Sequence, residues 1–174
     1  MSRTRAALLE GARRAVEESG TKITMSQVAG NSGVAKATLY NHFRTRDAVL
    51  AALLEAEVAR IIELAGTAED LAGALTLAAS ALSDSWLLRS LGRIEPSAVA
   101  ALGRVDLTTP GWRSARDAVR DRLDRAEVGG SSTVLRWLSS FFLTPGDSAA
   151  IAADVITMVA GLPALRGAES ARSA

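Results

Sequence analysis

The chain has 174 residues, 48% of them hydrophobic and 22% charged, which is typical of a folded globular protein and argues against disorder. It contains no cysteine, which excludes a disulfide framework and a cysteine-based metal site. The net charge is only +1, but residues 1–47 carry eight Lys and Arg against four acids, whereas residues 48–174 carry twelve against fifteen. Such an asymmetry indicates a nucleic-acid-binding module joined to a neutral or acidic body.

Neither a secretory signal nor a membrane span is expected. The first apolar run is interrupted by Glu10, Arg13 and Arg14, and the longest charge-free runs fall short of the ~20 apolar residues that a spanning helix needs. We therefore expect a cytoplasmic protein.

Abundant alanine and leucine, together with few alternating strand patterns, predict an all-α fold of about nine helices. The first helix is expected over 3–18. A short helix that Thr24 or Ser26 can cap runs to a turn at Asn31-Ser32-Gly33, and a second short helix covers about 35–41. A longer helix has Asp47 in its first turn and runs to about 64. Later helices are expected at about 68–83, 84–92, 96–103, 110–127, 131–142 and 147–165.

Two short helices joined by a glycine turn, with a helix on each side, are typical of a helix-turn-helix. The second short helix would enter the major groove of DNA, and the first would brace it against the backbone. The side chains expected on or near its exposed side are Lys36, Ala37, Thr38, Tyr40 and Asn41. Lys36 can reach guanine acceptors or a phosphate, and Thr38 can touch a thymine methyl group or donate to a phosphate.

The only tyrosine and the only histidine of the chain stand two positions apart, at Tyr40 and His42. Both carry a donor on a rigid ring, which suits them to hold a phosphate, and Thr24 and Ser26 can hold another at a helix start. A catalytic His42 would need a nucleophile and an orienting acid, and no such motif accompanies it. Tyr40 could instead belong to the core, where Phe43 is expected.

The stretch "ITMSQVAGNSGVAKATLYNHFRTRDAVLAALL" resembles the DNA-binding domain of the tetracycline-repressor (TetR) family of bacterial regulators, and the resemblance is dense over residues 5–60. The matching elements are Thr24, Val28-Ala29, Gly33-Val34, Thr38-Leu39-Tyr40, His42-Phe43 and the helix start from Asp47 to Leu50. Gly30 and Ser32 depart from the family pattern, which usually has a helix former and alanine there. Arg46 replaces the usual lysine and keeps its charge for DNA.

The resemblance implies a homodimeric regulator, usually a repressor, that binds a pseudo-palindromic DNA operator and releases it when a small molecule binds. It implies a DNA-binding domain at 1–47 and a helical effector-binding and dimerisation domain at 48–174. The last two helices typically form the dimer as a four-helix bundle. The apolar residues that would suit this interface are Leu135, Leu138, Phe142, Ile151, Val155, Met158, Val159 and Leu162. Core packing within one subunit explains these residues almost as well.

Trp86 and Trp112 lie in the middle helices and are candidate walls of a mostly apolar effector pocket, although aromatic residues at helical spacing are more often core. A hydrophobic or amphipathic effector would fit such a pocket. The sequence offers no nucleophile–base pair for a helical hydrolase or transferase, so we expect no enzyme, cofactor or metal site. The other alternative is a helical interaction module that keeps this fold without reading DNA.

Overall fold

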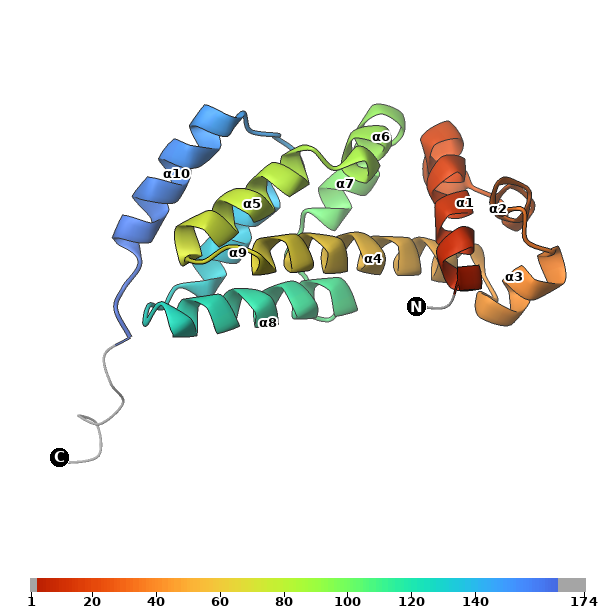
Figure 1. Ribbon diagram of the computed structural model, residues 1–174. Helices are drawn as coiled ribbons and strands as arrows, with labels where there is room; N and C mark the ends of the chain where they lie inside the picture. Colours follow the sequence, from red (N-terminus) through yellow and green to blue (C-terminus); the bar gives the residue numbers. More distant parts are fainter. Residues whose placement is uncertain (1–2, 166–174) are drawn as a thin grey trace.

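The computed structural model describes residues 3–165, and within this range it contains ten α-helices and one short 3-10 helix (Figure 1). Their bounds are α1 Arg3–Ser19, η1 Gly20–Lys22, α2 Met25–Ser32, α3 Lys36–His42, α4 Arg46–Gly66, α5 Leu71–Ser83, α6 Trp86–Ile94, α7 Pro96–Leu102, α8 Pro110–Arg125, α9 Ser131–Ser140 and α10 Ser148–Gly161. The only strand-like pairing in the described residues is an isolated bridge between Val128 and Ala164. The all-α expectation is confirmed.

The N-terminal module consists of α1, α2 and α3 packed against the first turns of α4, at the right of Figure 1. Its centre is formed by Leu8 of α1, Val28 of α2, Leu39 of α3 and Val49 of α4, each with no exposed surface. Burying such side chains contributes about 1.5–3 kcal/mol each. This shared core holds α2 and α3 at a fixed angle to each other.

Helix α4 belongs to two cores. Leu53 packs in the N-terminal core, and Ile61, two turns later, packs in a second core with α5, α8, α9 and α10. The N-terminal core also includes Leu87 and Leu91 of α6 and Val99 of α7. Figure 1 shows α4 running from the N-terminal module into the middle of the helical body. The division into domains at 1–47 and 48–174 stays a prediction.

The structure changes two of the expected helix ends. Asn31 and Ser32 are helical, and the turn is made by Gly33, whose φ of 67° lies in the left-handed region that favours glycine. Helix α10 ends at Gly161 rather than near 165, because Pro163 has no N–H to continue it. The chain then turns back, and the Gly129 N–H donates to the Pro163 carbonyl at 2.7 Å.

One stretch, Leu71–Ile94, is long and apolar enough to cross a membrane by length and composition. Its backbone is interrupted between Ser83 and Trp86, where α5 ends and α6 begins. More than half of its most apolar window is buried inside the protein, as in the core helices of proteins that cross no membrane.

Candidate nucleic-acid interface and effector cavity

The start of α2 is fixed by a capping box. The Thr24 hydroxyl accepts from the Gln27 N–H at 3.1 Å, and the Gln27 side-chain oxygen accepts from the Thr24 N–H at 2.8 Å. Thr24 was expected as a cap, and this is confirmed. Because its hydroxyl is engaged in the cap, a phosphate at this helix start would be met by the remaining free N–H groups.

Most predicted DNA-contacting residues lie on one exposed surface, formed by α3 and the start of α2. The exposed residues are Thr24, Ser26, Lys36, Ala37, Tyr40, Asn41, His42 and Arg46, and Thr38 is half-buried. Tyr40 is 43% exposed, so it does not belong to the core, whereas Phe43 is buried as expected. The structure thus brings these residues together, and their contact with DNA stays a prediction.

Several of these side chains are held in place by neighbours. The Lys36 ammonium donates to the Ser26 hydroxyl at 3.1 Å, which joins α2 to α3 across the exposed side. Arg46 pairs with Asp47 at 2.8 Å. Sequence reasoning missed Arg5, whose guanidinium lies 4.8 Å from the Phe43 ring centre and so adds a positive charge beside the end of α3.

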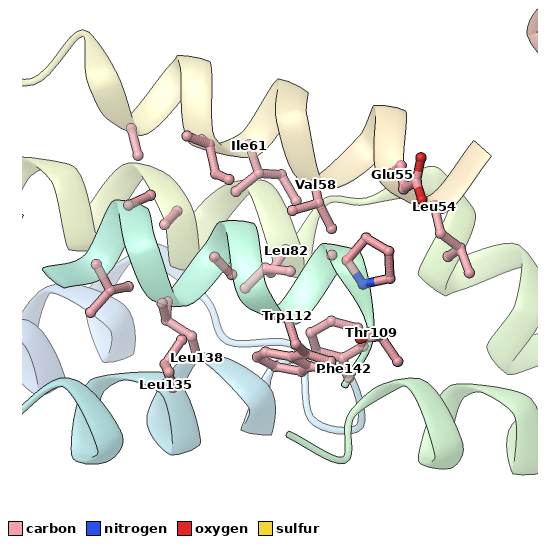
Figure 2. A pocket seen from close by; sticks show the side chains of 18 of the residues that line it. Leu54, Glu55, Val58, Ile61, Leu82, Thr109, Trp112, Leu135, Leu138 and Phe142 are labelled. Atoms are coloured by element: carbon pink, nitrogen blue, oxygen red, sulfur yellow. The ribbon is translucent and has the colours of Figure 1, made fainter. Parts of the chain in front are cut away.

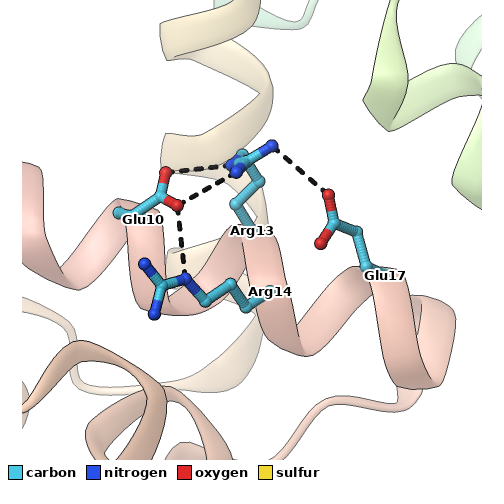
Figure 3. A network of polar contacts seen from close by, with 4 residues as sticks. All are labelled: Glu10, Arg13, Arg14 and Glu17. Atoms are coloured by element: carbon cyan, nitrogen blue, oxygen red, sulfur yellow. Dashed lines mark hydrogen bonds and ion pairs between the residues drawn. The ribbon is translucent and has the colours of Figure 1, made fainter.

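A charged network lies on the surface of α1 (Figure 3). Arg13 donates to both carboxylate oxygens of Glu10, at 2.9 and 3.0 Å, and to Glu17 at 3.3 Å, while Arg14 donates to Glu10 at 3.4 Å. The hydrogen bond from Arg13 is the main reason that the pKa of Glu10 lies below its usual value. The Arg13 guanidinium also lies 4.9 Å from the Trp86 ring centre, which joins α1 to α6.

Two further hydrogen-bonded contacts hold α6 against the N-terminal half of the chain. At its start, the buried Ser85 hydroxyl donates to Glu57 of α4 at 2.8 Å. At its end, Glu95 accepts from the Thr21 N–H at 2.6 Å and from the Thr21 hydroxyl. These bonds from Thr21 lower the pKa of Glu95. Helix α6 is therefore fastened at both ends.

A cavity of about 630 Å³ lies among α4, α5, α8 and α9 (Figure 2). Trp112 lines it and stacks on Phe142, with ring centres 5.7 Å apart. The Trp112 ring nitrogen donates to the Leu102 carbonyl at 3.2 Å, which fixes the ring. Trp86 does not line this cavity, and its ring packs beside Arg13 instead.

The residues predicted for the dimer interface lie against the subunit's own core. Leu135, Leu138, Ile151 and Val155 are buried there. The half-buried Phe142, Met158, Val159 and Leu162 pack on the same core. Leu135, Leu138 and Phe142 line the cavity. This packing accords with the alternative of a core within one subunit, and the part of these residues in a dimer stays a prediction.

Most of the cavity wall was not identified from the sequence. It comes from α4, α5, α8 and residues 101–109, and it includes Val58, Ile61 and Leu75, whose pattern in the sequence is that of ordinary core residues. Among residues 3–165 no three His, Asp or Glu side chains gather as metal ligands would.

Residues 8–53 match the family described as bacterial regulatory proteins, tetR family. No curated protein is similar enough in sequence to count as a relative. GusR of Salmonella enterica has a similar structure, with a TM-score of 0.59 and 20% identity over 91% of this chain and 94% of that one. A Rhodococcus sp. structure named as a TetR-family transcriptional regulator gives 0.59 and 21% identity, over 92% and 98%.

A third structure, from work on the control of antibiotic production by bacterial hormones, gives a TM-score of 0.60 and 18% identity, over 94% of this chain and all of that one. At these identities the likeness shows the fold alone. Proteins of the matched family are DNA-binding transcription factors and not enzymes, in agreement with the expectation from the sequence. Residues 8–53 therefore form a helix-turn-helix of the TetR type, and the chain has a TetR-like fold along nine-tenths of its length.

Proposed function

We propose that this regulator is a cytoplasmic repressor, which binds a pseudo-palindromic operator as a homodimer and releases it when a small hydrophobic effector occupies the cavity. In this proposal residues 1–47 read DNA, and residues 48–174 bind the effector and form the dimer. The observation that carries it is the position of α4, which supplies both the N-terminal core and one wall of the cavity.

Effector binding can act through α4 because neighbouring side chains on this helix face different partners. Leu53 is buried in the N-terminal core, whereas Leu54 and Val58 line the cavity. A ligand that fills the cavity only when α4 is tilted favours the tilted state by its difference in affinity for the two states. The two recognition helices of a dimer must meet major grooves roughly 34–36 Å apart, so a tilt of α4 weakens operator binding.

Helix α6 offers a second connection. Its end continues through α7 into residues 101–109, several of which line the cavity. Its start and its end are bonded to Glu57 and Thr21, as described above. A displacement of the cavity wall at residues 101–109 would therefore reach the N-terminal module through α6 as well as through α4.

The dimer is proposed to form through the outward side of α10. This side carries a stripe of small and apolar residues at helical spacing, namely Ala149, Ala152, Ala153, Ile156 and Ala160, all exposed. Ile156 is 71% exposed. Small side chains allow two helices to approach closely, and a twofold axis beside α10 would pair this stripe with its copy.

Analytical ultracentrifugation of Ile156→Arg tests this interface, since an unpaired arginine at the dimer axis is expected to yield monomers. Ser97→Arg, on the exposed side of α7, is the matched control and should sediment as the unchanged protein does. A dimeric Ile156→Arg protein would place the interface elsewhere.

Operator binding is tested by fluorescence anisotropy with labelled DNA from upstream of the protein's own gene. Tyr40→Phe and His42→Ala should each weaken binding roughly tenfold, the effect of losing one hydrogen bond to a charged phosphate. Arg120→Ala changes an exposed arginine on α8, far from α3, and is expected to bind as the unchanged protein does. Full affinity in both ring variants would refute the phosphate contacts.

The salt dependence of the same titration separates a DNA-binding regulator from an interaction module of the same fold. Lys and Arg contacts to phosphates release counterions, so affinity should fall steeply as salt rises. An affinity that is weak and insensitive to salt would favour the interaction module.

A further inference from the structure

The cavity is a long slot whose walls are mostly apolar. Its lining on α4 runs from Ala51 to Gly66, and the part from Glu55 to Gly66, eleven residues on, corresponds to about 16 Å at the rise of an α-helix. Helices α4, α5 and α8 supply small side chains that leave the space open, among them Ala51, Ala65, Ala74, Ala78, Ala115 and Ala118. An extended apolar chain of roughly a dozen carbon atoms matches this length.

At the end of the slot near the last turn of α4, the charged side chains of α8 are already paired with other parts of the protein. Arg122 donates to the carbonyls of Ala65, Gly66 and Ala68 at 3.0, 2.7 and 3.0 Å, and so caps the end of α4. Arg125 pairs with Asp121 at 2.7 Å. A polar group of a ligand at this end would have to displace one of these bonds, so this end suits an apolar tail.

The opposite end of the slot holds two charged side chains that are not engaged in such bonds. Within residues 3–165, neither Glu55 nor Arg104 forms a side-chain hydrogen bond or ion pair, and both line the cavity. Arg104 has Asp106 as a negative neighbour. Hydrogen bonds from Thr108 lower the pKa of Asp106, and the positive charge of Arg104 lowers it further. Glu55 has no such cation, so its negative charge is the uncompensated one at this end.

A second hollow reinforces the negative charge around Glu55. It has a volume of about 240 Å³, shares Glu55 and Val58 with the slot, and adds Glu63. No Lys or Arg lines it. Because Glu55 is exposed at the rim, a charged group that pairs with it keeps part of its hydration and avoids most of the desolvation cost of a buried ion pair.

An aromatic surface lies at the same end. Figure 2 shows Glu55 on α4 at one end of the slot, Thr109 and the stacked rings of Trp112 and Phe142 on the opposite wall, and Leu135 and Leu138 further along. Tryptophan is the aromatic side chain that best attracts a cation to its face. An unpaired carboxylate and an indole face on one side of an apolar slot are the groups that recognise an ammonium with an apolar tail.

We propose that the effector of this regulator is a monocationic amphiphile, whose ammonium head lies between Glu55 and Trp112 and whose apolar tail extends along α4 toward Arg122. The inference rests on the proposed function only in taking this cavity as the effector site. Glu55 is then the residue that determines selectivity for a cation, and the alanines of α4, α5 and α8 determine the length of tail that fits.

The test compares three probes that share one tail and differ in head charge: decylammonium, decanol and decanoate. Each is titrated into the purified full-length protein by isothermal calorimetry, below the concentration at which it forms micelles and without DNA. Decylammonium should bind about tenfold more tightly than decanol, as expected for one exposed ion pair with a cation–π contact, and decanoate should bind most weakly.

Two variants that each remove one charge locate the selectivity. Glu55→Gln should remove most of the preference for decylammonium over decanol, leaving only the contribution of Trp112, and should leave decanol binding unchanged. Arg104→Gln is the matched control at the same end and should preserve the order of the three probes. Decanoate binding best, a decylammonium preference that is undiminished in Glu55→Gln, or no binding of any probe would each overturn the proposal.

Because these titrations contain no DNA, their result is independent of operator binding. Tight decylammonium binding in a protein that binds no operator would keep this inference and reject the proposed function. Operator binding without any probe selectivity would keep the proposed function and reject this inference.

Discussion

The replacement of Gly11 by alanine is expected to disturb the N-terminal module, because α1 passes close to α2 at this residue. A Cβ at Gly11 would lie 2.6 Å from both the Cβ and the backbone nitrogen of Ser32, and 2.7 Å from the Val28 carbonyl oxygen. Non-bonded carbon atoms prefer separations of about 3.5–4.0 Å. These atoms belong to the backbone or are attached to it, so no side-chain rotation relieves the contact.

The size of the effect follows from two opposing contributions. Alanine inside a helix is favoured over glycine by about 1 kcal/mol, and forcing a methyl group into a packed interface costs about 1–3 kcal/mol. Since three contacts are shorter than any relaxed Cβ contact, the cost should lie at the upper end of that range or above it. We expect Gly11→Ala to lower the free energy of unfolding by about 2 kcal/mol, and the melting temperature by about 4–8 °C.

Gly30→Ala is the matched control, since it makes the same chemical change in the same module. Nothing lies within 4 Å of a Cβ at Gly30, so only the helix propensity changes, and α2 should gain up to about 1 kcal/mol. Urea unfolding followed by circular dichroism measures both variants. If Gly11→Ala proved as stable as Gly30→Ala, the close approach of α1 and α2 would be refuted.

Two further predictions concern the contacts of α6. Burial alone would raise the pKa of Glu57, but hydrogen bonds from Arg60 and Ser85 bring it below 4.5. Ser85→Ala should therefore destabilise the protein most above pH 4.5. Urea titrations should show that the difference in unfolding free energy between the two proteins shrinks below that pH, as acid protonates Glu57. A difference independent of pH would contradict this. Glu95→Ala should speed hydrogen exchange at the Thr21 N–H and leave α9 unchanged, whereas unaltered protection of Thr21 would argue against the contact.

The N-terminal module could be predicted from the sequence because its determinants are local. Thr24 begins a helix through a bond to a residue three positions later, and Gly33 ends it by adopting a positive φ. The exposed side of α3 follows from the spacing around the buried Leu39. Each of these features depends on residues within one or two helical turns, which is the range over which sequence patterns are informative.

The cavity and the interface could not be predicted in the same way. Trp86 and Trp112 stand near the starts of two helices, and only the packing of α6 on α1 and of α8 on α4 separates their roles. On α10 the larger apolar residues, such as Val155, are the ones that the sequence suggests for an interface, but they are buried in the core. Alanines and Ile156 form the exposed stripe of α10. Alanine occurs both in cores and on surfaces, so its position in the sequence does not indicate which side of the helix is exposed.

The attachment of α4 at its far end suggests how a small ligand could have a large effect on DNA binding. Arg122 joins three carbonyls at the end of this helix to α8, which is the opposite wall of the slot. A ligand that widens the slot near Glu55 would leave this end fixed and turn α4 about it. The helix has 21 residues, about 30 Å, so a turn of about 5° would move Arg46 by about 2–3 Å. A shift of that size in each subunit is comparable with the length of a hydrogen bond, and it would remove the proposed phosphate contacts that depend on short side chains such as Thr38.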